Sequence, residues 1–432
     1  MKKGIVVGFF ILVFSSIHAF SQTPTPTPSR ARVVGANPTA VIFSPTPIPK
    51  TVIVTNNLPS PTPLAKATMT PTPASIGILN NPVQTVPQTY IYSSLKFGEI
   101  KSKLAEAKRE MSARPLATSL TDSFLLTNMV RIAFYDYDTK NLDYIVMTKE
   151  SFLTRGAQFV TTTSKSKYVT VTIIRANGVN TPVTIIGQNN KAHLPLMVQY
   201  PVERGGRYIE TAYYMSTHPG ILTPEIINAG KLYIRNTIDL ARRKLQEKGI
   251  FISPQVTDIA ERLAIVEHID HPRFWSEYHL NLFNEVYALY ALNEGQTYRY
   301  AVSSAGAGGM VQMIPSTYFM IRSRYSGVGL IPDFVEGMRN HLNAAQAMLL
   351  YMQMTWIDLI ASPTVFEAVQ TGIATPAELM SAGYNSNPAK LPGYIKRGGA
   401  GWRNLIPRET KIYLQINASM DRFVPISAPR TK

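Results

Sequence analysis

The sequence predicts an α+β protein in which a small β-rich module precedes an all-α C-terminal domain. Three observations predict this class. Between about residues 129 and 214, short runs of β-branched and aromatic residues alternate with polar ones, as in half-buried strands. From Thr223 onward, apolar residues recur at helical spacing behind capping residues. Residues 22–90 contain 14 of the 31 Pro and no Asp or Glu, so they predict a disordered, semi-extended Pro/Thr-rich linker.

The N-terminus has the pattern of an export signal. Lys2 and Lys3 precede an apolar stretch, and Ala19-Phe20-Ser21 fits a cleavage site. We therefore predict a signal peptide over residues 1–21 and an exported protein of the periplasm or cell envelope, with full secretion as an alternative. An uncleaved anchor over residues 4–20 is the other alternative, although the stretch is short for a span of about 20 residues. Membrane contact is expected only in that case.

Composition narrows the classes of partner. The chain has 43 Lys and Arg against 27 Asp and Glu, a net charge of +16, which favours anionic surroundings. Export argues against nucleic acid as the partner and favours an acidic envelope polymer. The chain has no Cys, which excludes disulfides, thiolate metal sites and a cysteine nucleophile.

A helix opens the module predicted over residues 91–222, and strands follow it. The helix is expected over residues 95–112, and Asn177-Gly178 predicts a turn between two strands. The strands are expected at residues 130–134, 142–147, 168–174, 183–186, 194–199 and 208–214. No motif with recognisable chemistry occurs here, so envelope protein partners, substrate positioning and plain scaffolding all stay open.

The all-α domain is predicted over residues 223–432. Thr223-Pro224 and Ser253-Pro254 are typical helix starts, and Thr375 with Glu378 forms a capping box. Further helices are expected over residues 276–294, from 315, over 341–360 and after 407.

Glu294 is the candidate catalytic residue. It lies in the last turn of the helix predicted over residues 276–294, and Gly295 follows as a plausible end residue. Helix C-termini carry partial negative charge, and four Tyr residues lie nearby in the sequence. Both effects disfavour the ionised carboxylate, as a general acid working near neutral pH requires. The alternative is an exposed Glu at a fraying helix end.

A glycine-dense stretch follows, residues 303–317. Gly306, Gly308 and Gly309 would let the backbone approach a ligand closely, and Gln312 offers both a donor and an acceptor. The stretch lacks the Gly-Lys-Ser/Thr of a phosphate loop, and Val311 stands where a dinucleotide fingerprint needs its third Gly. A tight structural turn is the alternative.

The stretch from Glu294 to Thr317 resembles the core of the family-1 lytic transglycosylases, whose fold is related to goose lysozyme. That family has a catalytic Glu-Ser pair, a Ser nine positions after the Glu, and a Gly-Ala-x-Gly-Leu-Met-Gln-x-Met-Pro-x-Thr run. Here Glu294 and Ser303 match and residues 306–317 align with the run without a gap, with Gly295 and Met310-Val311 as departures. Residues 383–388 resemble the family's Ala-Tyr-Asn-x-Gly-Pro element, and 407–413 its Pro-x-Glu-Thr-x-x-Tyr element.

The resemblance covers about residues 255–420 and implies a peptidoglycan lytic transglycosylase, a carbon–oxygen lyase that needs no cofactor. Such an enzyme cleaves the β-1,4 bond between N-acetylmuramic acid and N-acetylglucosamine and forms a 1,6-anhydro ring. Glu294 would act as the acid and then as the base, and Tyr384 would hydrogen-bond its carboxyl. The resemblance also implies sugar contacts from Ser303, Gly309, Met310, Gln312, Ile314, Tyr384, Asn385 and Tyr413.

Other functions compete with this one. A glycan-binding or scaffold protein could use the same residues without turnover, and a lysozyme-type muramidase would hydrolyse the same bond. Residues 267–271, with His279 nearby, superficially resemble a metal-ligand cluster. Their spacing is not H-E-x-x-H, so we predict no metal site and favour capping and polar packing for these residues.

Overall fold

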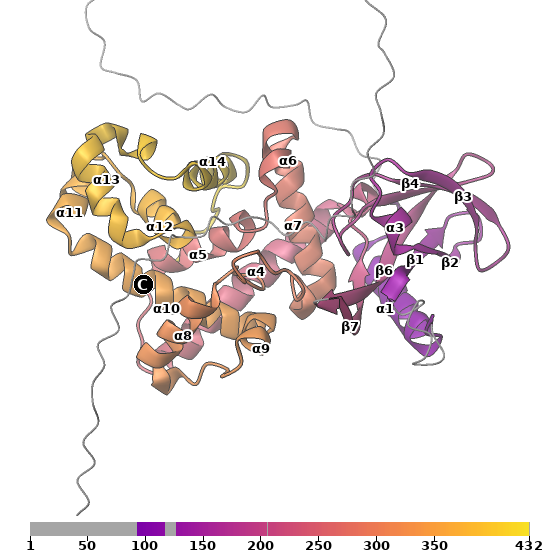
Figure 1. Cartoon of the computed structure of the whole chain (residues 1–432), viewed down its shortest axis with the longest axis horizontal. Helices are drawn as coiled ribbons and strands as arrows, with labels where there is room; N and C mark the ends of the chain where they lie inside the picture. The colour runs from indigo at the N-terminus through magenta and orange to yellow at the C-terminus, as the bar shows by residue number, and fades with distance from the viewer. Residues whose placement is uncertain (1–92, 117–126, 205, 432) are drawn as a thin grey trace, which may run out of the picture.

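The computed structural model describes residues 93–116, 127–204 and 206–431 (Figure 1). The predicted signal peptide (1–21) and linker (22–90) lie outside these ranges. Within them the chain forms helices and one antiparallel sheet, which confirms the α+β class. None of the helices in these ranges combines the length and apolarity that crossing a membrane requires.

Seven antiparallel strands form a curled sheet at one end of the described part of the molecule (Figure 1). Along the sheet the order is β2-β1-β6-β5-β4-β3, and β7 pairs with β6. The strands are β1 (Met129–Asp136), β2 (Asn141–Thr148), β3 (Gln158–Thr162), β4 (Tyr168–Ile173), β5 (Val183–Gly187), β6 (Ala192–Arg204) and β7 (Arg207–Met215). All six predicted strands are confirmed, and β3 is an additional edge strand.

Both faces of the sheet are buried around β1. Ile132 pairs with Ile145 of β2 and Val198 of β6, and all three belong to a core inside the curl of the sheet. The next residue, Ala133, points the other way and joins the main core of the molecule. Successive side chains of a strand face opposite sides, so the sheet contributes to two cores.

Helix α1 (Phe97–Ala113) confirms the helix predicted over residues 95–112 and packs against β6. Its buried residues are Ile100, Leu104, Ala107 and Met111, one stripe at helical spacing. Two short elements accompany the sheet, α3 (Lys149–Phe152) and η1 (Pro219–Ile221).

The elements after Leu222 are helical. They are α4 (Pro224–Gln246), α5 (Pro254–Val266), α6 (His271–Ser276), α7 (His279–Asn293), η2 (Glu294–Gln296), α8 (Pro315–Arg324), η3 (Ser326–Val328), α9 (Phe334–Arg339), α10 (His341–Ile360), α11 (Pro363–Gln370), α12 (Pro376–Asn385), η4 (Pro388–Lys390), α13 (Leu391–Gly398), η5 (Gly399–Asn404) and α14 (Arg408–Phe423). The predicted caps are confirmed, since Thr223 accepts from the Ile226 N–H, Ser253 from Val256, and Thr375 from Glu378.

The sheet and these helices share the main core. It contains Leu196 of β6, Ile100 of α1 and Met420 of α14. Helices α4 and α7 cross closely in this core, where a Cβ on Gly230 would lie 1.9 Å from the Tyr287 carbonyl oxygen. The helices after Leu222 therefore share this core with α1 and the sheet, and α10 to α13 also pack around a separate cluster that includes Trp402.

Candidate functional site

Glu294 lies on the surface. It is the C-cap residue of α7, with φ 45° and ψ −127°, and its side chain is 55% exposed. Its carboxylate accepts a hydrogen bond from Lys101 of α1 at 2.6 Å. The neighbouring tyrosines expected to shield it are turned inward: Tyr290 is fully buried and Tyr298 nearly so. The prediction that apolar groups surround the Glu294 carboxylate is therefore wrong.

The expected hydrogen bond between Tyr384 and Glu294 is also wrong. The Tyr384 hydroxyl donates its proton to the Val311 carbonyl oxygen at 2.7 Å. Tyr413 of α14, which is 2% exposed, donates its hydroxyl proton to a different glutamate, reaching Glu267 Oε1 at 2.9 Å. The two tyrosines thus contact the glycine-dense segment and the end of α5.

Glu267 ends helix α5 as its C-cap residue and is partly buried. A helix C-terminus carries partial negative charge, which disfavours a carboxylate there. The next residue, His268, places its Nε2 2.9 Å from the Met310 carbonyl oxygen. The end of α5 therefore touches the glycine-dense segment directly, and Tyr413 holds its carboxyl from α14.

The glycine loop (residues 303–313) is braced by its own polar groups. Ser303 Oγ accepts from the Ala307 N–H at 3.0 Å, and Gln312 Nε2 donates to the Gly309 carbonyl at 2.9 Å. Gly309 has φ +68°, and a Cβ there would lie 2.2 Å from the Met338 carbonyl oxygen of α9. The loop is therefore seated tightly against α9, and Ser303 and Gln312 make its internal contacts.

The remaining predicted sugar contacts lie in the glycine loop and at the ends of helices. Ile314 is the N-cap residue of α8, and Met310 is fully buried. Asn385 ends α12, and its Oδ1 accepts from Thr410 Oγ1 of α14 at 2.9 Å. The structure thus gathers the loop, α12, α14 and the end of α5, and leaves Glu294 out of this group. Whether these residues contact sugar stays a prediction.

Sequence reasoning considered Glu267 only within the metal-like cluster of residues 267–271 and missed it as a candidate acid. One signal could have found it, because Glu267 ends the helix that Ser253 caps and precedes the glycine loop, just as Glu294 ends α7 before the same loop. The family spacing of nine positions to Ser303 favoured Glu294. In the structure α6, α7 and η2 lie between Glu267 and Ser303, and Asp270 caps α6 by accepting from the Arg273 N–H. The capping expected within residues 267–271 is confirmed for Asp270.

Comparisons with known proteins add no assignment. Neither protein-family models, nor curated proteins, nor solved structures match this chain. The candidate site therefore depends on its own geometry.

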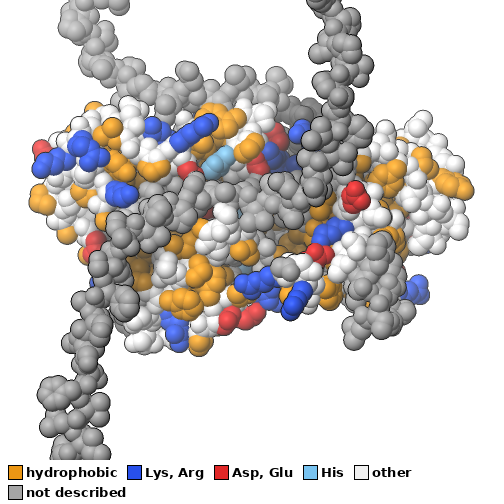
Figure 2. Space-filling view, in the orientation of Figure 1, with side chains coloured by type: hydrophobic (Ala, Val, Ile, Leu, Met, Phe, Trp, Pro, Cys, Tyr) orange, Lys and Arg blue, Asp and Glu red, His pale blue; other side chains and the backbone are white. Residues whose placement is uncertain are grey.

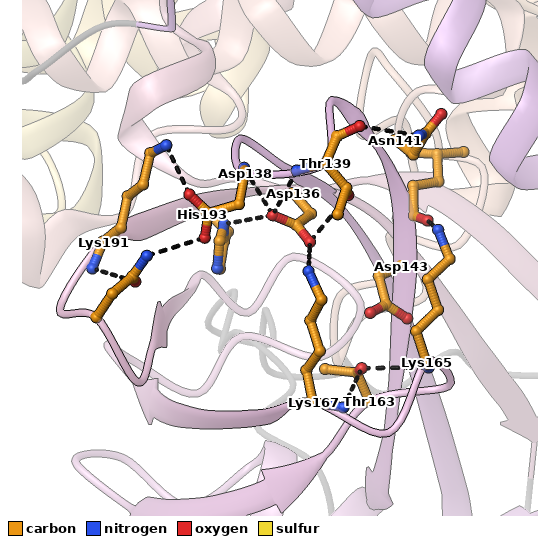
Figure 3. Close-up of polar contacts among 12 residues, drawn as sticks. Asp136, Asp138, Thr139, Asn141, Asp143, Thr163, Lys165, Lys167, Lys191 and His193 are labelled. Atoms are coloured by element: carbon orange, nitrogen blue, oxygen red, sulfur yellow. Dashed lines mark hydrogen bonds and ion pairs between the residues drawn. The ribbon is translucent and has the colours of Figure 1, made fainter.

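A second polar cluster lies on the sheet, far from Glu267 in the sequence (Figure 3). Asp136, Asp138 and His193 bring their ligand-type atoms within 4.8 Å of one another. Lys167 donates to Asp136 at 2.5 Å and Lys191 to Asp138 at 2.7 Å. Each carboxylate thus has an ammonium partner, so the cluster balances its own charge and ties the end of β1 to the segments just before β4 and β6. The residues suit an ion-pair network better than a divalent cation.

One open hollow of about 680 Å³ lies at the opposite end of α5 from Glu267. Asp258, Trp356 and Arg430 are among the residues that line it. Arg430 donates to Asp258 at 2.8 Å and to Asp239 at 2.6 Å, which fastens the C-terminal segment to α4 and α5. This hollow contains none of the predicted site residues.

Proposed function

We propose that the protein is a peptidoglycan lytic transglycosylase, that residues 223–432 have the lysozyme-like fold of that family, and that Glu267 rather than Glu294 is its acid. The observation that carries the proposal is the hydrogen bond from Tyr413 to Glu267 beside the glycine loop. Tyr413 and the loop come from two sequence elements that resemble the family. Their meeting at a glutamate on a helix C-terminus supports a glycan-cleaving site.

The chemistry needs one carboxyl group when the sugar supplies its own nucleophile. Glu267, protonated, would donate its proton to the glycosidic oxygen between the two sugars. The 2-acetamido group would stabilise the positive centre. Glu267 would then accept the proton of the muramoyl 6-hydroxyl as that oxygen closes the 1,6-anhydro ring. Tyr413 would keep the carboxyl in one orientation through both steps.

The rest of the chain fits an exported enzyme in this proposal. Residues 1–21 would direct export, with secretion or anchoring through residues 4–20 as alternatives, and residues 22–90 would form a tether. Residues 91–222 would hold the catalytic region or bind an envelope protein. Lys and Arg side chains are spread over the visible face (Figure 2), and the net charge is +16. Such a charge attracts a carboxylate-bearing polymer and raises the encounter rate.

The deciding experiment digests purified sacculi with the full chain and identifies the products by mass spectrometry. The wild type should release anhydro-muropeptides, Glu267→Gln should release none, and Glu294→Gln should stay within about threefold of wild type, since its carboxylate faces solvent. Thermal unfolding of both variants serves as the control for folding.

Each contrary outcome has a distinct meaning. Reducing-end products would make the protein a muramidase, and intact glycan that still co-sediments with the protein would make it a binding protein. Loss of activity in Glu294→Gln alone would return the acid to Glu294 and overturn the assignment of Glu267.

A further inference from the structure

His268 connects three parts of the candidate site: the end of α5 at Glu267, the glycine loop, and Tyr298 just before the loop. Its ring lies flat on Tyr298, with centroids 3.3 Å apart and planes within 2°. Its Nε2 lies 2.9 Å from the carbonyl oxygen of the fully buried Met310. The residue is therefore held on one side by an aromatic face and at one end by the glycine loop, directly after Glu267.

The contact with Met310 determines where the imidazole carries a proton. A carbonyl oxygen only accepts hydrogen bonds, so Nε2 must carry the hydrogen in this contact. The stack with Tyr298 fixes the plane of the ring, and Tyr298 in turn packs edge-on against the buried Tyr290 of α7. The donor thus has a fixed direction, set by groups outside the loop.

The stack between His268 and Tyr298 also joins the two ends of the chain segment that contains α6, α7 and η2. After His268 the chain leaves the site through α6 and α7, and it returns through η2 to Tyr298 just before the glycine loop. Arg273 of α6 donates to Glu285 of α7 at 2.7 and 2.8 Å, so hydrogen bonds within this segment hold α6 against α7. His268 and Tyr298 are the point where its two ends meet.

We propose that His268 is a positioning residue, which fixes the glycine loop against the end of α5 so that a glycan bound on the loop meets the Glu267 carboxyl. This inference rests on the proposed function and deepens it. It makes the donor on His268 matter for turnover more than for binding, because a small displacement of the loop misaligns the proton transfer while leaving most sugar contacts in place.

The test compares His268→Gln with His268→Asn, using purified glycan strands and the full chain. The Gln side chain can place an amide N–H near the position of Nε2, whereas the shorter Asn side chain cannot. We expect Asn to lower kcat by roughly 10- to 100-fold with KM changed less than about threefold, and Gln to recover most of that loss. Thermal unfolding of both variants is the control for folding, and Asn should be the less stable by only about 1 kcal/mol, because it loses the hydrogen bond to the Met310 carbonyl.

Equal kcat values for Gln and Asn, whether both low or both near wild type, would overturn the positioning role. A change confined to KM would overturn it too, since it would make His268 a binding residue. These results presuppose a wild-type enzyme that yields anhydro products. A wild type that yields none refutes the proposed function itself, and the two failures are thereby distinguished.

Discussion

Replacing Gly309 by Ala tests the seating of the glycine loop without reference to any activity. At this position φ is +68°, and the added Cβ would lie 2.2 Å from the carbonyl oxygen and 3.0 Å from the carbonyl carbon of Met338. Both atoms belong to the backbone of α9, so no side-chain rotation relieves the contact. Either the loop or the end of α9 must move.

Two energetic costs determine how much Gly309→Ala should lower the free energy of unfolding. A residue with a Cβ in the left-handed region costs roughly 1–2 kcal/mol, and overpacking a tight contact costs roughly 1–3 kcal/mol more. The matched control is Gly306→Ala, because Gly306 also has positive φ, +76°, but its nearest atoms are those of Pro315 at 3.7 Å. The control has only the cost of a Cβ in the left-handed region, so the free energies of unfolding of the two variants should differ by about 1–3 kcal/mol.

Urea-induced unfolding of both variants and the wild type measures this difference, with equal slopes as the condition for comparison. Gly309→Ala should have the lower free energy of unfolding. Equal destabilisation of the two variants would mean that the loop does not rest on Met338 as described. The described contact between the glycine loop and α9 would then be refuted.

Two further predictions concern single polar groups. Tyr413→Phe should lower glycan cleavage by roughly 10- to 100-fold, because the hydrogen bond that orients Glu267 is lost, and should cost only about 1 kcal/mol of stability; unchanged turnover in the product assay would contradict this. Glu285→Gln should cost about 3–5 kcal/mol in urea unfolding, because it leaves Arg175 and Arg273 without their buried carboxylate partner, and a loss below 1 kcal/mol would refute it. Burial would raise the pKa of the Glu285 carboxyl, but the two guanidinium groups hold it below its usual 4.5, so the pair stabilises the fold above pH 4.5 and loses this contribution as the pH falls further.

The sequence predicted most elements, because capping residues and hydrophobic spacing act locally. The helix over residues 341–360 is confirmed with the same bounds, since Asn340 caps it by accepting from the Asn343 N–H. Strand β3 was missed because it is a five-residue edge strand whose side chains are partly or fully exposed. No buried residue therefore marks it in the sequence. The short helices α6, α9, α11 and α13 were likewise too brief to show a period.

The candidate site could be predicted only in part, and for a different reason. Motif spacing orders residues along the chain, but it does not say which way a side chain points after a helix ends. Glu294 satisfies the spacing, yet its positive φ turns its carboxylate toward Lys101 on the surface. Glu267 fails the spacing, yet Tyr413 from the far end of the chain contacts it. That contact joins residues 146 positions apart, which no local pattern reports.

The connection between β7 and α4 supplies a prediction that depends on protonation. His218 precedes η1, and its Nδ1 accepts a hydrogen bond from the Gly220 N–H at 3.0 Å. An accepting nitrogen must keep its lone pair, so protonation of Nδ1 would break this bond. Burial lowers the pKa of His218 to about 4, whereas the unfolded chain titrates near the ordinary value of 6.5.

Because the folded pKa is the lower one, the contribution of His218 to stability is complete above pH 6.5 and is lost as the pH falls toward 4. One proton costs about 1.4 kcal/mol per pH unit, so roughly 3 kcal/mol is at stake over this range. His218→Asn should remove that part of the pH dependence, because the Asn oxygen can accept from the same N–H and does not titrate. Urea unfolding at pH 7 and pH 4.5 measures the effect, and the wild type should lose about 2–3 kcal/mol more than the variant. Parallel losses would mean that folding does not lower the pKa of His218, which would refute this prediction.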